Sequence, residues 1–271
     1  AEQFGLNWKA AYRAMLDDLK MRKIRIAVYW DRTEPEKGAY DFSETDWLIA
    51  EAGARNAEIV LAVGQKLPRW PECFVPDWAK ALPMEERESA LIAYIERTVR
   101  RYKSSGAVKV WQVENEPLLN FGECPVFYAN LLDREIAAVR ALDSRPIMVT
   151  DSGELSLWVA AHRRADIFGS TMYRNVWSPL LGNYTYPLPP AFFRLKRAMV
   201  ELLGEAKPAT VIELQAEPWQ HKALYETAAA EHLALMNPEK FRETLEYAAQ
   251  TGFDTFYLWG IEWWYWLKTT Q

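Results

Sequence analysis

Short apolar runs alternate with longer amphipathic segments along the whole chain, and this alternation constrains the fold more than any other feature. Runs in which apolar residues predominate are typical of strands buried on both faces of a parallel sheet. We expect strands at Ile24–Trp30, Glu58–Gly64, Val108–Glu114, Pro146–Asp151, Ile167–Tyr173, Ala209–Leu214 and Asp254–Trp259.

Helices are expected between these strands, because the intervening segments repeat apolar residues at helical spacing. They are Trp8–Met21, Ser43–Arg55, Glu85–Arg101, Phe127–Leu142, Phe192–Leu203 and Pro238–Thr251. Pro238 after Asn237 is a typical helix start, with Asn as the cap and Pro at the first helical position. No repeat or low-complexity linker interrupts the alternation, which favours a single domain over residues 1–271.

The expected fold class is α/β, a (β/α)8 TIM barrel, although the segments supply only seven clear strands. Too few residues precede the helix at Trp8 for a full strand. The first barrel strand is therefore missing from this chain or reduced to Gln3–Leu6. A barrel without that strand exposes strand edges between its second and eighth strands, and such edges invite pairing with another chain. Self-association is therefore an open alternative.

Composition excludes several function classes. The net charge is −5 and no basic stripe is present, which argues against a nucleic-acid partner. The three His are scattered without ligand-like spacing, so we expect neither a metal nor another cofactor. No apolar run reaches the roughly 18 residues of a membrane span. The chain has 13 Trp, 13 Tyr and 11 Phe, so besides core rings we expect some Trp to line a groove that binds sugar rings.

Acidic residues stand at the ends of two expected strands. One strand continues into Glu114, Asn115 and Glu116, and the other contains Glu213. Burying a carboxylate without a partner costs several kcal/mol, roughly, so polar groups inside apolar runs point to a functional site. The carboxyl ends of parallel barrel strands form the catalytic face. Cleavage of a glycosidic bond needs two carboxyl groups, about 5–5.5 Å apart in retaining enzymes.

The sequence Asn115-Glu116-Pro117, at the end of the fourth barrel strand, resembles the signature of clan A glycoside hydrolases such as families five, thirty-nine and one. The resemblance covers nearly the whole chain. It implies that Glu116 is the acid/base and that Asn115 holds the sugar 2-hydroxyl. It also implies that Glu213, ending the seventh barrel strand, is the nucleophile. Glu217 competes with Glu213 but lies past the expected strand end, which suggests a substrate-binding or supporting role.

The same resemblance assigns three further positions. Arg25 matches the Arg on the second barrel strand that lies beside the nucleophile. Tyr173 matches a Tyr that donates a hydrogen bond to the nucleophile, and Trp259 matches a Trp on which the sugar ring rests. Four more Trp follow strand ends and are candidate platforms: Trp30, Trp70, Trp177 and Trp219. The chain departs from family five at Thr171, where that family has His, and at the third strand end, which carries Gln65, Lys66 and Arg69. The exact family, and with it the sugar, therefore stays open.

The function predicted from these residues is a retaining glycoside hydrolase acting on β-linked glycosides or polysaccharides. For that role Glu116 must start protonated and Glu213 ionised. The alternatives are a non-catalytic or degenerate sugar-binding barrel, since a fold does not dictate function, and a metal-dependent barrel hydrolase, which the few His disfavour.

The two cysteines follow neighbouring strands. Cys73 follows the third barrel strand and Cys124 the fourth, so a disulfide and two free thiols are both open. A disulfide would favour an oxidising compartment, secreted or at the cell surface, over the cytoplasm.

Overall fold

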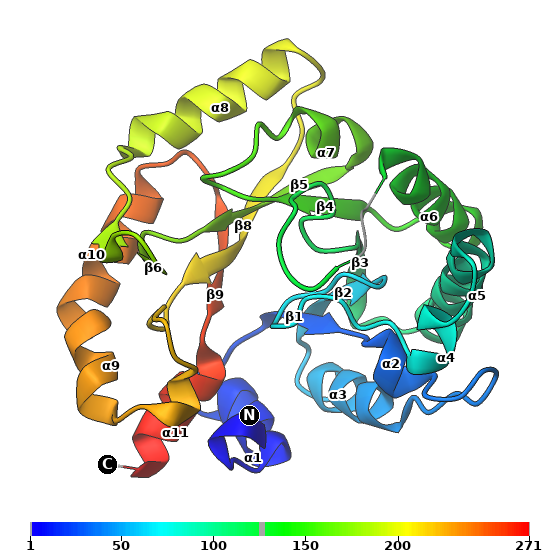
Figure 1. The fold of residues 1–271 in the computed structure, drawn as a ribbon, viewed down its shortest axis with the longest axis horizontal. Helices are drawn as coiled ribbons and strands as arrows, with labels where there is room; N and C mark the ends of the chain where they lie inside the picture. The colour runs from blue at the N-terminus through cyan, green and yellow to red at the C-terminus, as the bar shows by residue number, and fades with distance from the viewer. Residues whose placement is uncertain (1, 125–127, 271) are drawn as a thin grey trace. The chain divides into compact units, whose positions relative to one another are not determined.

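The computed structural model describes residues 2–124 and 128–270. Its main sheet has seven strands in the order β1-β2-β3-β4-β5-β8-β9, with helices between them, and the fold is a TIM barrel (Figure 1). The chain divides into two compact units. The first unit is Arg22–Gly169, and the second is formed by residues up to Met21 together with those from Ser170 onward. Each is described by itself.

Parallel strands form the centre of the first unit. They are β1 (Lys23–Ala27), β2 (Glu58–Val63), β3 (Val108–Val113), β4 (Ile147–Asp151) and the beginning of β5 (Ile167–Met172). Strands β1 to β4 pair in parallel, with Ile24 opposite Ile59 and Leu61 opposite Trp111. The five strands expected in this region are confirmed to within a few residues. Their apolar side chains are buried, which explains the near-continuous apolar runs.

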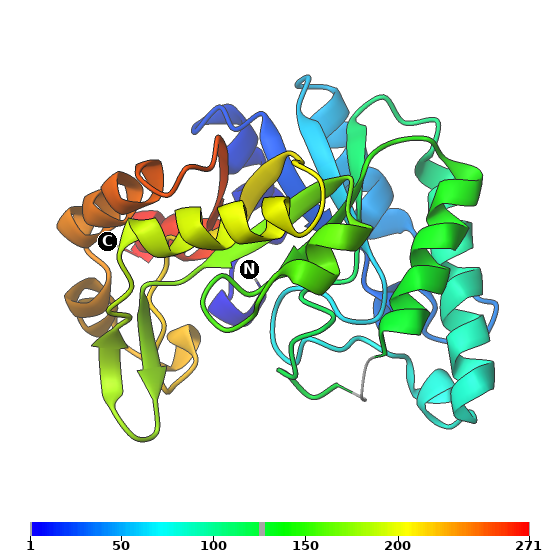
Figure 2. The same ribbon diagram turned by 90° about the horizontal axis from the view of Figure 1, so that it is seen from above.

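Helices surround these strands. They are α2 (Trp30–Thr33), α3 (Ser43–Gly53), α4 (Asp77–Lys80), α5 (Met84–Tyr102), α6 (Ala129–Leu142) and α7 (Val159–Arg164). Helices α5 and α6 lie side by side in both ribbon views (Figure 1, Figure 2). The expected start of α6 at Phe127 lies outside the described residues.

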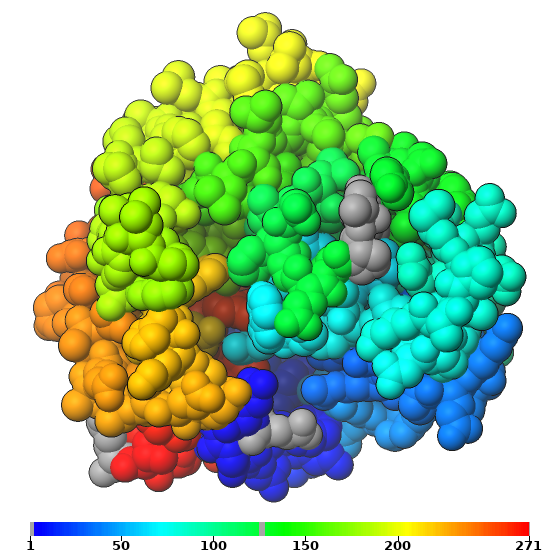
Figure 3. Space-filling view, in the orientation of Figure 1, coloured from blue at the N-terminus to red at the C-terminus, as the bar shows by residue number. Residues whose placement is uncertain are grey.

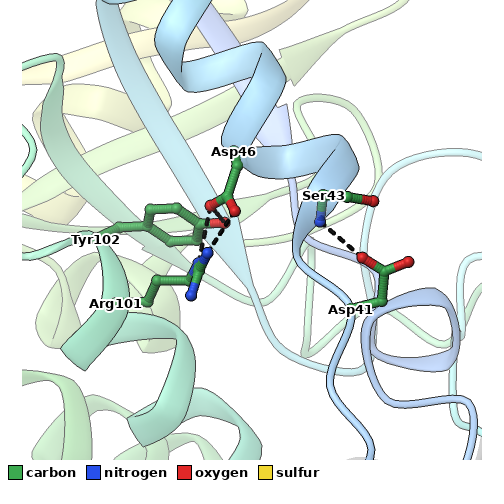
Figure 4. Close-up of polar contacts among 5 residues, drawn as sticks. All are labelled: Asp41, Ser43, Asp46, Arg101 and Tyr102. Atoms are coloured by element: carbon green, nitrogen blue, oxygen red, sulfur yellow. Dashed lines mark hydrogen bonds and ion pairs between the residues drawn. The ribbon is translucent and has the colours of Figure 1, made fainter.

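Polar contacts fix α3 against the end of α5 (Figure 4). Oδ1 of Asp46, on α3, accepts from Nε of Arg101 at 2.8 Å and from the Tyr102 hydroxyl at 2.9 Å. The hydrogen bond from Arg101 holds the pKa of Asp46 below its ordinary value. Asp41 accepts the backbone N–H of Ser43 at 2.8 Å and so closes the start of α3. The helical layer that backs β2 and β3 is thus tied together.

The second unit contains the last two strands of the barrel sheet, β8 (Ala209–Gln215) and β9 (Thr255–Trp259), which pair in parallel. It also contains an antiparallel hairpin formed by β6 (Asn175–Ser178) and β7 (Gly182–Thr185). Its helices are α1 (Trp8–Asp17), α8 (Pro190–Leu202), α9 (Ala229–Leu235), α10 (Pro238–Ala249) and α11 (Ile261–Thr270). As expected, Asn237 caps α10 by accepting from the Lys240 N–H at 2.9 Å.

The residues before α1 form no strand in the part of the chain that the structure describes. Between residue 2 and α1 the chain forms a 3-10 turn at Glu2–Phe4, and no strand precedes α1 among the residues described. The reduced strand at Gln3–Leu6 is therefore not formed. Within its unit, α1 packs against α11.

Candidate active site

The turn after β3 carries the expected acid/base. Glu114 and Glu116 have positive φ angles of 59° and 44°, a left-handed conformation that costs a non-glycine residue about 1–3 kcal/mol. Such a conformation persists only where surrounding contacts enforce it. One of these is the Glu116 N–H, which donates to Oγ1 of Thr150 on β4 at 2.8 Å. The Glu116 side chain is buried, with 8% of its surface exposed.

Asn115 is held by residues from two other strands of the first unit. Nη2 of Arg25 donates to its Oδ1 at 2.6 Å, and the Thr150 hydroxyl donates to the same atom at 3.3 Å. These contacts orient the Asn115 amide. The structure thus brings Arg25 and Asn115 together. The expected contact between Arg25 and Glu213 stays a prediction, because these two residues belong to different units.

The Glu114 side chain joins the turn after β3 to the loop after β2. Its carboxylate accepts the backbone N–H of Gln65 at 2.9 Å and that of Lys66 at 2.5 Å. Gly64 makes room for it, because an added Cβ there would overlap the Glu114 carboxyl group. Complete burial raises the pKa of Glu114 to about 7, against the opposing effect of the two backbone hydrogen bonds.

Glu114 interacts with a second buried acid, Glu135 on α6, and each carboxyl group shifts the pKa of the other. Among the described residues no hydrogen-bond partner reaches either Glu135 oxygen. Two carboxylates in contact cannot both be ionised, so one must hold a proton. Burial, followed by the charge of Glu114, raises the pKa of Glu135 well above its ordinary value, which makes Glu135 the protonated partner.

Lys66 is a further buried residue that contacts the turn after β3. The residue is 1% exposed, and its ammonium group donates to the carbonyl oxygens of Glu116 at 2.9 Å and Leu119 at 2.6 Å. From the sequence, Lys66 counted only as a departure from family five. Its position directly after an apolar strand was the one available signal of burial, and that signal does not reveal what the ammonium group contacts.

In the second unit, the expected nucleophile lies on β8. Glu213 is 5% exposed, and the Tyr173 hydroxyl donates to its Oε2 at 2.7 Å. A hydroxyl donor stabilises the ionised carboxylate, which is the form that can attack a carbon atom. The structure therefore brings together Tyr173 and Glu213, as the sequence predicts.

Gln215 positions Tyr173, although nothing in the sequence marks it for this role. Its fully buried amide accepts the N–H groups of Arg174 at 3.0 Å and Asn175 at 2.9 Å, and donates to the Asn175 carbonyl at 2.6 Å. The end of β8 and the turn after β5 are thereby joined. The backbone directly after Tyr173 is consequently held in place, which restricts where the Tyr173 side chain can lie.

Glu217 lies against the end of β9. An added Cβ at Gly260, whose φ is +125°, would meet the Glu217 Cβ at 2.6 Å, so only glycine allows this approach. The backbone N–H of Ala216, the residue before Glu217, donates to the carbonyl of Trp259 at 2.9 Å. Glu217 is 8% exposed, and Trp259 is half-buried.

Trp219 lies between Tyr173, which contacts Glu213, and the β6–β7 hairpin. Its ring meets that of Tyr173 edge-on, with 5.1 Å between the ring centroids, and 37% of the residue is exposed. A small cavity of about 90 Å³ adjoins it, lined by Asn175, Val176, Asn183, Tyr184, Thr185, Trp219, Leu235 and Lys240. The hairpin and the segment after β8 lie side by side on the face seen in Figure 3. Trp177 of the hairpin contacts the His221 ring, with 5.7 Å between the centroids.

The candidate platforms of the first unit differ in exposure. Trp30 is completely buried, stacked on Tyr94 and donating from Nε1 to Glu34 at 2.9 Å. It is a core residue, and its expected role as a platform is wrong, because no face of its ring is open. Trp70 is 63% exposed and meets Phe121 edge-on.

The two cysteines are bonded to each other. Cys73 and Cys124 form a disulfide with Cα atoms 5.2 Å apart, which joins the loops after β2 and β3. Within residues 2–124 and 128–270, no group of three or more His, Cys, Asp or Glu could hold a metal ion. None of the helices described is both long and apolar enough to cross a membrane.

Part of the chain matches a known family. Residues 20–127 match Glycosyl hydrolase family 10. The matched stretch contains Arg25, Lys66, Asn115 and Glu116 and ends before Glu213. The match supports the resemblance to clan A glycoside hydrolases, and it does not confirm family five or thirty-nine.

Similarity to individual proteins points the same way. The chain is 26% identical over 165 residues to β-galactosidase BgaA of Clostridium cellulovorans, covering 53% of this chain and 25% of that protein. A β-galactosidase structure from Marinomonas aligns with a TM-score of 0.64 at 12% identity, covering 93% of this chain and 51% of the other. Xylanase 10B of Thermotoga petrophila, in complex with xylobiose, also reaches 0.64, at 14% identity, with 95% and 79% covered. The two solved structures share the fold of this chain. The match to BgaA spans about a quarter of the length of that protein.

Proposed function

We propose that this chain is the catalytic barrel of a retaining β-glycosidase, with Glu213 as nucleophile and Glu116 as acid/base. The observation that carries the proposal is the strand-end carboxylate of Glu213 receiving the Tyr173 hydroxyl at 2.7 Å. A carboxyl group that a hydroxyl donor holds in a fixed orientation is suited to attack an anomeric carbon.

The chemistry follows from these roles. Glu213 attacks the anomeric carbon while Glu116 gives its proton to the departing glycosidic oxygen, forming a glycosyl ester on Glu213. Glu116, now ionised, takes a proton from water as the water oxygen attacks the same carbon. The ester bond breaks, and both carboxyl groups return to their starting state. Asn115, oriented by Arg25, is suited to hold the sugar hydroxyl next to that carbon.

Exposed Trp219 is a proposed platform for a sugar ring. The cavity beside it is too small for a whole ring, but Asn175, Asn183 and Lys240 line it with polar groups that could bind a sugar hydroxyl. Exposed Trp70 and half-buried Trp177 and Trp259 are further proposed platforms. Relatives named β-galactosidase and xylanase make β-galactosides and β-xylosides the first substrates to test. The disulfide favours an oxidising compartment as the place of action.

A panel of 4-nitrophenyl β-glycosides tests the proposal, with proton NMR to follow the configuration of the released sugar. We expect hydrolysis of at least one β-glycoside, with the β-anomer as first product. Release of the α-anomer would refute the retaining mechanism. Binding without any hydrolysis would favour the non-catalytic sugar-binding barrel.

Variants assign the two carboxylates. Glu213→Gly should abolish turnover, and azide should restore it with formation of the α-glycosyl azide, because azide then replaces the nucleophile. Glu116→Gln should retain activity on activated aryl glycosides and yield the β-glycosyl azide. Glu217→Gly is the matched control. If that variant, and not Glu213→Gly, yields the α-azide, Glu217 is the nucleophile.

A further inference from the structure

Lys66 is a buried cation that the mechanism above does not use. It is 1% exposed, and its ammonium group lies under the acid/base turn rather than in solvent. Two of its three hydrogens are accounted for by the carbonyls of Glu116 and Leu119. Both carbonyls belong to the short segment that presents the Glu116 carboxyl group.

Burial lowers the pKa of Lys66 from its ordinary value. The neighbouring carboxyl groups of Glu72, Glu116, Glu114 and Asp151 act in the opposite direction and favour the charged ammonium group. A buried ion of this kind is weak evidence for stability, because well-packed apolar residues often serve a fold equally well. The contacts of the charge are therefore better explained by what they hold in place.

The backbone of Lys66 is held as firmly as its side chain. Its N–H donates to the Glu114 carboxylate, and its carbonyl accepts the N–H of Asn115 at 2.7 Å. Gly64 leaves space for that carboxylate. Hydrogen bonds from both the backbone and the side chain of Lys66 therefore join the loop after β2 to the turn after β3. Glu116, which has a positive φ angle, lies within that turn.

We propose that Lys66 is a positioning residue for the acid/base: its ammonium group holds the segment Glu116–Leu119 so that the Glu116 carboxyl reaches the leaving-group oxygen. The inference rests on the proposed function, because it presupposes that Glu116 donates a proton. It goes further by assigning a second residue to the acid half of the reaction. Lys66 does not touch the substrate in this scheme.

A series of aryl glycosides with leaving groups of increasing pKa tests the proposal, using Lys66→Met and Lys66→Gln. Loss of a well-placed general acid costs roughly 10²–10⁴-fold on substrates with poor leaving groups. We expect both variants to lose about a hundredfold in kcat/KM on the poorest leaving groups but less than about tenfold on dinitrophenyl glycosides. The slope of log kcat/KM against leaving-group pKa should become steeper, as it should for Glu116→Gln.

Lys196→Met is the matched control, because Lys196 is also a buried lysine but lies on α8, over the Phe192 ring. It should leave the slope unchanged. Equal losses on all leaving groups in the Lys66 variants would overturn the proposal, as would failure of both to fold, since Lys66 would then serve the fold alone. An inactive wild-type protein would instead refute the proposed function.

Discussion

The buried pair Glu114–Glu135 makes folding stability depend on pH in a way that one substitution can isolate. Both side chains are 0% exposed, and the pKa of Glu135 is raised well above the ordinary value of 4.5 that it has in the unfolded chain. The folded protein therefore keeps a proton that the unfolded chain releases. Stability from this group is fully present below about pH 4.5 and is lost as the pH rises toward the folded-state pKa. Glu135→Gln keeps a donor for Glu114 but cannot ionise.

The magnitude follows from proton linkage. One proton bound by the folded state and not by the unfolded state changes the unfolding free energy by about 1.4 kcal/mol per pH unit. As the pH rises from about 5, Glu135→Gln should therefore gain stability relative to the wild type, by up to that amount per pH unit.

Urea unfolding at about pH 5, 6 and 7 measures this difference directly. Glu86→Gln, which removes an exposed carboxyl from α5, is the control and should run parallel to the wild type. If the Glu135→Gln and wild-type stabilities also change in parallel over this range, Glu135 does not hold an extra proton in the fold. The assignment of the proton to Glu135 would then be wrong.

Three further predictions concern single contacts. Gly64→Ala should destabilise the fold by more than about 3 kcal/mol in urea unfolding, since it combines positive φ with overlap of the Glu114 carboxyl, and a wild-type midpoint would contradict this. Tyr173→Phe should lower kcat/KM roughly ten- to a hundredfold, the range for a hydrogen bond to a charged group, with an unchanged thermal midpoint; full activity would remove Tyr173 from the Glu213 site. Reduction of Cys73–Cys124, which are 51 residues apart, should cost about 2–4 kcal/mol, and Cys73→Ser should then be insensitive to reductant.

Much of the fold was predictable because it depends on local patterns. Apolar runs predict buried parallel strands, and Asn237-Pro238 predicts a helix start, since both signals act over a few residues. Within the site, the contact between Tyr173 and Glu213 was expected from the resemblance to clan A glycoside hydrolases, and the strand pattern alone does not predict it. Trp30 could not be placed, because a Trp at a strand end has the same local pattern whether it packs inward or lines a groove.

By itself, the sequence determined the order of strands and helices and the strand-end positions of Glu116 and Glu213. These follow from hydrophobic periodicity and chain direction. Only the tertiary structure decided that the Lys66 ammonium group donates to the Glu116 carbonyl, that Glu135 interacts with Glu114, and that Gln215 binds the backbone directly after Tyr173. Each of these contacts joins residues from different strands, loops or helices, and desolvation at the point of contact sets their chemistry. No spacing along the chain encodes such a meeting.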